Sequence, residues 1–123
     1  MKLVEIDGKK YISFKFHELA WSLRTSGVSQ YIFDSEGNAI KRFYSCKQAF
    51  SVELPKNAKF LLIRYWTNRG NPKHRLYLIT DKLEMIEIFT ASTTLEDVLA
   101  LEEKLPKKLI DFLLDDLQLL GED

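Results

Sequence analysis

Cysteine and long apolar runs are what this sequence has least of, and each shortage excludes a class of protein. The single cysteine, Cys46, cannot form an internal disulfide, and the first residues lack the charged and then apolar order of a signal peptide. The longest apolar runs, such as residues 60–63, are far shorter than the ~20 residues that cross a bilayer. We therefore expect a cytoplasmic protein that has no membrane partner.

Catalytic motifs are missing as well. Only two histidines occur, His17 and His74, and neither has the spacing of a pair of metal ligands. The sequence contains no GxxxxGKS/T, GxGxxG or GxSxG segment, so neither a phosphate-binding loop nor a nucleophile elbow is indicated. Cys46 is interpreted as a half-buried strand residue rather than a reactive thiol. These absences predict a non-catalytic protein without a metal or a cofactor.

The composition is that of a folded domain. The 123 residues are 46% hydrophobic and 29% charged, which argues against a wholly disordered or fibrous chain. A chain of this length fits a single domain and can bury roughly two-thirds of the surface that its unfolded form exposes. We expect one domain with two parts, a basic and aromatic sheet region over residues 1–91 and an acidic, Leu-rich helical segment over residues 92–123.

Charge is distributed unevenly along the chain, although the net charge is zero. Residues 1–80 hold 14 Lys and Arg against 6 Asp and Glu, a net charge of +8, and residues 81–123 hold 4 against 12, a net charge of −8. A basic block of this kind favours an anionic partner, of which nucleic acid is the commonest. The alternative is that the acidic helices pack beside the basic sheet and neutralise it.

Alternating apolar residues predict a sheet built from hairpins. Strands are expected over residues 2–6 and 9–16 around the turn Asp7-Gly8, over 30–34 and 39–46, over 60–66 and the return strand to residue 80, and over 82–90. Residues 17–24 have helical spacing, and residues 47–53 fit a helical turn or a short strand equally well. The residues expected in the core of the first hairpin are Val4, Ile6, Ile12, Phe14 and Phe16.

The C-terminal third predicts two helices. A capping box formed by Thr93 and Glu96 starts the first, and Pro106 breaks it and suits the first turn of the second. The second helix carries an apolar stripe at spacings of three and four, which either caps the sheet or pairs with a copy of itself. The residues of this stripe, and of the dimer interface if it pairs, are Leu109, Phe112, Leu113, Leu117 and Leu120. The fold class is thus α+β: an antiparallel sheet of six or seven strands, one short internal helix and two C-terminal helices.

The hairpin at residues 60–80 carries most of the functional information. Strand alternation puts Arg64 and Trp66 on one face, and Arg75 and Tyr77 repeat the same spacing on the return strand. The strand at 39–46 has the pairs Lys41 with Phe43 and Arg42 with Tyr44, of which only one can face solvent. Arg69 and Lys73 in the turn extend the basic track. The candidate nucleic-acid contacts are Lys41, Arg42, Phe43, Tyr44, Arg64, Trp66, Arg69, Lys73, Arg75 and Tyr77.

Cations beside flat aromatic rings are what unpaired bases and their phosphates require of a protein surface. The sequence therefore favours non-catalytic binding of single-stranded DNA or RNA, with a homodimer through the Leu-rich helix as an option. Two alternatives stay open: a protein-interaction or adaptor domain, and a small enzyme or ligand-binding domain with a pocket between sheet and helices. In architecture alone, a basic aromatic sheet followed by a Leu-rich helix resembles the ThermoDBP type of archaeal single-stranded DNA-binding protein. That resemblance covers the architecture only and assigns neither a function nor a residue.

Overall fold

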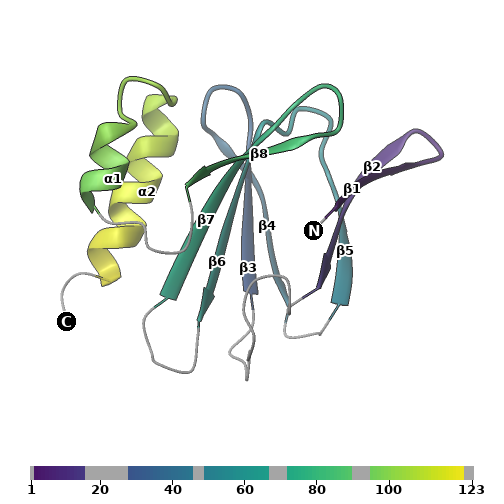
Figure 1. The fold of residues 1–123 in the computed structure, drawn as a ribbon, viewed down its shortest axis with the longest axis horizontal. Helices are drawn as coiled ribbons and strands as arrows, with labels where there is room; N and C mark the ends of the chain where they lie inside the picture. The colour runs from purple at the N-terminus through teal and green to yellow at the C-terminus, as the bar shows by residue number, and fades with distance from the viewer. Residues whose placement is uncertain (1, 16–27, 46–48, 67–71, 90–94, 121–123) are drawn as a thin grey trace.

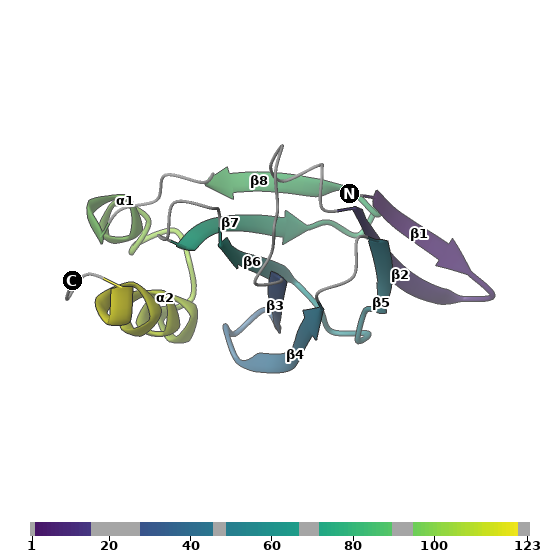
Figure 2. The same cartoon turned by 90° about the horizontal axis from the view of Figure 1, so that it is seen from below.

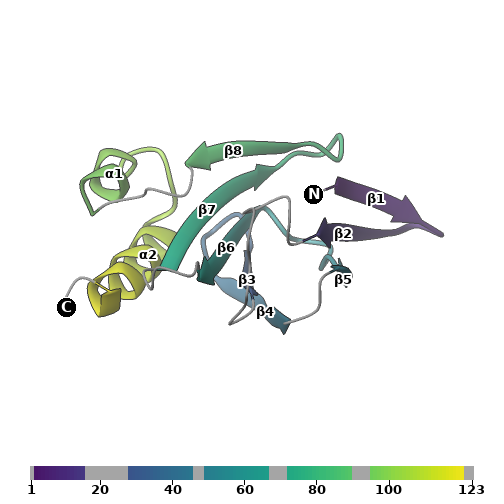
Figure 3. The same cartoon turned by 60° about the horizontal axis from the view of Figure 1, so that its bottom comes forward.

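Three layers lie side by side along the long axis of the computed structural model, which describes residues 2–15, 28–45, 49–66, 72–89 and 95–120. Two helices form one end, a five-stranded sheet the middle and a three-stranded sheet the other end (Figure 1). Views from two further directions keep this order (Figures 2 and 3). The helices are α1 (Leu95–Ala100) and α2 (Lys107–Leu120). For residues 45, 49, 50, 66, 72, 73, 95, 97 and 116–120 only the backbone is described.

Both sheets are antiparallel, as expected for an α+β protein built from hairpins. The smaller sheet has the order β1-β2-β5, and its strands are β1 (Lys2–Ile6), β2 (Lys9–Lys15) and β5 (Ala49–Glu53). The larger sheet has the order β4-β3-β6-β7-β8, and its strands are β3 (Val28–Phe33), β4 (Ala39–Ser45), β6 (Phe60–Trp66), β7 (Pro72–Ile79) and β8 (Met85–Phe89).

The expectation of one sheet with six or seven strands is wrong, because the described residues form eight strands in two sheets. The chain changes sheets after β4. The next strand, β5, pairs with β2, which is far away in the sequence. Residues 49–53 are therefore a strand, which decides between the two alternatives left open for this segment. The helix expected at residues 17–24 lies outside the described residues.

The first hairpin has the predicted turn and only part of the predicted core. Asp7 and Gly8 both have positive φ, 52° and 80°, as a two-residue turn between twisted strands requires. With this turn Ile6 pairs with Lys9 and Leu3 pairs with Ile12. Directly paired residues point to the same side of a sheet, so Val4 and Ile6 lie on the face opposite Ile12. Ile12 and Phe14 are buried as expected, whereas Ile6 is 57% exposed.

Each face of the five-stranded sheet carries a buried core. One face packs against the three-stranded sheet, where Leu61, Ile63 and Tyr65 of β6 join a core that includes Ile12 and Phe14. The other packs against the helices, in a core made of Tyr31, Phe33, Phe60, Leu62, Leu76, Val98, Leu109, Ile110 and Leu113. We name them the sheet-side face and the helix-side face. Both faces of β6 therefore carry buried side chains, Leu62 toward the helices and Leu61 and Ile63 toward the three-stranded sheet.

The loop between β3 and β4 fixes the position of α2. Gly37 has a φ of 87°, and a Cβ built there would lie 2.7 Å from the backbone nitrogen of Leu109 and 2.9 Å from Cβ of Pro106. Only a glycine lets the loop approach the start of α2 this closely. Lys108 Nζ donates a hydrogen bond of 2.9 Å to Asn38 Oδ1 from the same turn of helix. The loop thus packs against and hydrogen-bonds to the start of α2, the helix that covers part of the helix-side face; we say that the loop seats this helix.

Candidate functional site

The strand register separates two arginines that the sequence places on one surface. In the β6–β7 pair Arg64 lies opposite His74, and Arg75 lies opposite Ile63. Since neighbouring positions on a strand point to opposite faces, Arg64 belongs to the helix-side face and Arg75 to the sheet-side face. The pairs Arg64 with Trp66 and Arg75 with Tyr77 therefore do not form one platform.

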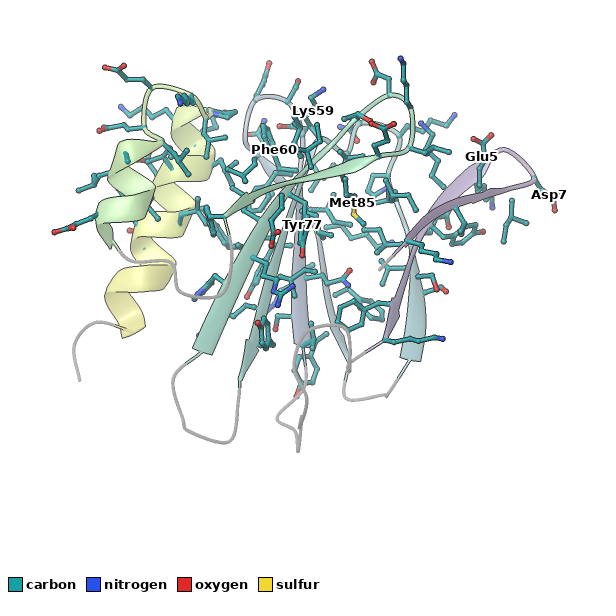
Figure 4. The ribbon with its side chains drawn as sticks, in the orientation of Figure 1. Glu5, Asp7, Lys59, Phe60, Tyr77 and Met85 are labelled. Carbon is teal, nitrogen blue, oxygen red and sulfur yellow. The ribbon has the colours of Figure 1, made fainter. Side chains whose placement is uncertain are left out.

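Arg75 lies between two tyrosines on the sheet-side face. Its Nε donates a hydrogen bond of 3.4 Å to Tyr65 Oη, and its guanidinium carbon stands 5.9 Å from the centre of the Tyr65 ring. Burial lowers the pKa of Arg75, but hydrogen bonds to the hydroxyls of Tyr77 and Tyr65 favour the charged form more strongly, so that its pKa is raised. Both tyrosines are buried, and burial raises the pKa of Tyr77. Figure 4 shows Tyr77 within the body of the molecule. This arginine is hydrogen-bonded to two buried tyrosines, although, like Arg64, it is itself partly exposed.

Lys41 and Phe43 share the sheet-side face with Arg75. Their register partners on β3 are Ile32 and Gln30, which point toward the three-stranded sheet. Lys41 Nζ donates a hydrogen bond of 2.7 Å to the backbone oxygen of Glu53, on β5 of that sheet. Phe43 is partly buried against the core between the sheets. Of the two alternative pairs on β4, Lys41 and Phe43 are thus the pair that contacts the three-stranded sheet and the core between the sheets.

Arg42 and Tyr44, the other pair, lie on the helix-side face. Tyr44 is opposite Ser29, and Ser29 is opposite Arg64, so these side chains form one row across β4, β3 and β6. Tyr44 is 52% exposed and Arg64 is partly exposed. Arg42 is exposed, and its guanidinium carbon stands 5.3 Å from the centre of the Tyr31 ring. We call Arg42, Tyr44 and Arg64 the helix-side row.

The α2 helix limits the helix-side row on one side. Phe112 packs against the rings of Tyr31 and Phe33, each at a centroid distance of 5.1 Å. Tyr31 thus has Phe112 on one side and the Arg42 guanidinium close to its ring. The apolar core beneath α2 ends at this residue, and the exposed cationic and aromatic side chains begin beside it.

Three predicted contacts fall wholly or partly outside the described residues. Trp66 and Lys73 belong to β6 and β7, and only their backbone is described. Arg69 lies in the segment between those strands, outside the described residues. By register Trp66 belongs to the helix-side face with Arg64, and Lys73, opposite Tyr65, belongs to the sheet-side face.

The first three residues of the predicted dimer stripe pack inside this molecule, against the five-stranded sheet. Leu109 and Leu113 are buried in the core that α2 makes with the five-stranded sheet, and Phe112 packs against that core. Of the two alternatives for this helix, capping describes these three residues. Only the backbone of Leu117 and Leu120 is described, and pairing through that end of the helix stays a prediction.

Gln30 is a feature that sequence reasoning missed. Its side chain is 0% exposed, and within the described part of the chain neither its Nε2 nor its Oε1 has a hydrogen-bond partner. It lies opposite Phe43 and Ile63 on the sheet-side face. A buried amide without partners costs about 1 to 3 kcal/mol of stability. The sequence signal was a lone amide in an otherwise apolar strand, VSQYIF, at a position whose alternation matches the core residue Ile32.

Metal sites and membrane-spanning helices are both absent from the described residues. In the part of the chain that the structure describes, no three His, Cys, Asp or Glu residues lie close enough to hold a metal ion. No helix among the described residues is long and apolar enough to cross a membrane. The chain has no significant match among protein-family models, curated proteins or solved structures.

Proposed function

We propose that this protein binds single-stranded nucleic acid, without catalysis, at the helix-side row. The observation that carries the proposal is the position of Tyr44: a half-exposed ring in one transverse row with Arg64 and two positions from Arg42 on the same strand face. A base can stack on the ring while the flanking guanidinium groups meet phosphates. Sequence preference would be weak, because every base has a face that can stack.

The row contains fewer residues than the sequence predicted. Arg75 and Tyr77 lie on the other face within a hydrogen-bonded network, and Lys41 bonds to the backbone of β5. These residues support the fold in this account and contact no ligand. Trp66 and Arg69 remain candidates on the basis of sequence alone.

Protein–protein interaction is the second candidate function. Among the described residues, the large hydrophobic side chains that stand exposed besides Tyr44 are Ile6, Ile86 and Leu99, none of which belongs to the helix-side row. Contiguous apolar patches are typical of protein contacts, whereas single exposed apolar side chains are common on any protein. Since these three residues lie on β1, β8 and α1, any protein contact that they make is separate from the row.

A fluorescence anisotropy titration with a labelled single-stranded oligonucleotide at low salt tests the nucleic-acid proposal. The wild-type protein should bind, and the logarithm of its affinity should fall linearly with the logarithm of salt concentration, with a slope of about −0.7 per phosphate contacted. Tyr44→Leu keeps an apolar side chain but removes the flat ring, and should weaken binding about 5-fold or more. Tyr44→Phe keeps the ring and should bind like the wild type.

Two substitutions that each remove one positive charge test whether the row contacts phosphates. Arg42→Ala should weaken binding and flatten the salt dependence, because one phosphate contact is lost. Lys82→Ala removes an exposed cation from the β7–β8 turn and should change neither quantity. Absence of an anisotropy change at low salt, or an affinity that does not depend on salt, would show that the proposed function is wrong.

A further inference from the structure

The β1–β2 hairpin projects from one end of the molecule as an arm with an apolar strip on its outer face. In Figure 4 the labelled residues Glu5 and Asp7 mark this hairpin, far from the helices. The outer face is the one opposite Ile12 and Phe14, and it carries Ile6, Val4 and Tyr11. Ile6 is 57% exposed, and the other two are partly exposed. The strip is therefore open to a partner.

Lysines surround this strip. The exposed side chains of Lys2, Lys9 and Lys15 share the outer face with Ile6, and the acid on that face is Glu53 of β5. Lys9 is the direct register partner of Ile6. We call this set, Lys2, Val4, Ile6, Lys9, Tyr11 and Lys15, the arm surface. Val4 and Tyr11 form its middle, and Ile6 and Lys9 form its end at the Asp7-Gly8 turn.

The α1 helix presents the same arrangement with the opposite charge. Leu99 is 47% exposed, although it belongs to a helix whose Val98 is fully buried. Exposed carboxylates flank it: Glu96 in the preceding turn, and Glu102 and Glu103 just after the helix, against Lys104. We call Glu96, Leu99, Glu102 and Glu103 the α1 surface.

We propose that the arm surface of one molecule binds the α1 surface of a second copy of this chain. The two surfaces match in kind, because each has an exposed aliphatic side chain next to charged side chains, and their charges are opposite: Ile6 lies opposite Lys9 at the turn end of the arm, and Leu99 lies between Glu96 and Glu102. Such complementarity favours a specific encounter over random contact. They lie at opposite ends of the long axis, so one molecule cannot bring its own arm to its own α1 (Figure 1).

A contact between two different surfaces closes into a reciprocal dimer or a ring, or extends into an open chain when the rotation does not close. In each case the extent of association rises with protein concentration. Both surfaces are small, which places the contact among weak, transient interfaces. The charged margins make it sensitive to salt. The inference does not depend on nucleic-acid binding, because neither surface includes the helix-side row.

Sedimentation velocity over a range of protein concentrations tests the proposal. At about 50 mM salt the weight-average sedimentation coefficient of the wild type should rise with concentration, and at about 500 mM salt the rise should disappear. Ile6→Glu inactivates every arm and Leu99→Lys inactivates every α1 surface, so each variant alone should stay monomeric. Ile86→Glu is the matched control, because Ile86 is 51% exposed on β8 but belongs to neither surface, and it should associate like the wild type.

Mixing the two defective variants gives the sharpest readout. The Leu99→Lys protein keeps a working arm and the Ile6→Glu protein keeps a working α1 surface, so the mixture should form 1:1 dimers and nothing larger. A wild type without concentration dependence at low salt, or a mixture as monomeric as its components, overturns the proposal. Loss of oligonucleotide affinity in Ile6→Glu, with no self-association of the wild type, also overturns it and makes nucleic acid the partner of the arm.

Discussion

The two faces of the five-stranded sheet carry arginines on neighbouring strands, but in different surroundings. On the sheet-side face Arg75 lies between the buried rings of Tyr65 and Tyr77. On the helix-side face Arg64 shares a row with the half-exposed ring of Tyr44. The sequence shows the same pattern in both strands, an arginine two positions before an aromatic residue: Arg64 and Trp66 in β6, and Arg75 and Tyr77 in β7. The layers that cover the two faces differ: the sheet-side face packs against the three-stranded sheet, and the helix-side face packs against the helices.

The largest effect is expected from a substitution that disturbs the contact between the β3–β4 loop and α2, because α2 shields part of the helix-side face from solvent. Gly37→Ala combines a positive φ with a Cβ that would clash with the backbone of Leu109. We expect the free energy of unfolding in urea to fall by about 3 kcal/mol or more.

Gly8→Ala is the matched control for this substitution. Gly8 also has positive φ, 80°, but no atom lies within 4 Å of the added Cβ. Its cost should be the conformational part alone, about 1 kcal/mol. Equal losses for the two variants would show that the loop does not seat the helix.

Replacing the buried amide tests whether the sheet-side face is sealed from water. Gln30→Met keeps the volume and removes two buried polar atoms that have no partner among the described residues. The free energy of unfolding should therefore rise by about 1 to 3 kcal/mol. Lys82→Met, at an exposed position, should change it little. A loss of stability in Gln30→Met would mean that the amide has partners in the folded protein.

Arg75→Met tests the network on the same face. The variant keeps an apolar stem but loses hydrogen bonds to two tyrosine hydroxyls. Stability should fall by about 1 to 2 kcal/mol, as measured by urea denaturation. If the urea midpoint and the slope of the transition are unchanged in the variant, Arg75 does not stabilise the fold.

Acidification should have the smallest effect, through the loop that seats α2. The pKa of Asp34 lies below its usual 3.8, because its carboxylate accepts hydrogen bonds from the side chain and backbone of Asn38 and from the backbone of Glu36. A lowered pKa in the folded state adds stability above the unfolded pKa, and this is lost as the pH falls through the folded pKa. Below pH 3.8 the wild type should therefore lose its advantage over Asp34→Asn. Parallel stability curves for the two proteins would contradict this assignment.

Local patterns in the sequence predicted most elements of this fold. The turn at Asp7-Gly8, the antiparallel pairing of β6 with β7 and the helix after Pro106 all follow from alternation, turn chemistry and helical spacing over short stretches. The partner of β5 does not, because it pairs with a distant strand in another sheet. Non-local pairing leaves no signal within a few residues.

The candidate site could be predicted only in part, for the same reason. Residue types indicated cations beside aromatics, and Arg42, Tyr44 and Arg64 do lie together. Which of the two pairs on β4 faces solvent depends on register and on the second sheet, neither of which is visible in the residues of β4 itself. The burial of Tyr77 has the same origin, since the core that it joins includes Ile12 and Phe14, which lie far away in the sequence.

The most direct test of the difference between the two faces uses the same substitution on both. Arg64→Met and Arg75→Met remove the same guanidinium from adjacent strands, and each variant is first shown by circular dichroism to be folded. In anisotropy titrations with a single-stranded oligonucleotide at low salt, Arg64→Met should weaken binding and reduce its salt dependence, while Arg75→Met binds like the wild type. Weaker binding by Arg75→Met with unchanged binding by Arg64→Met would contradict the account.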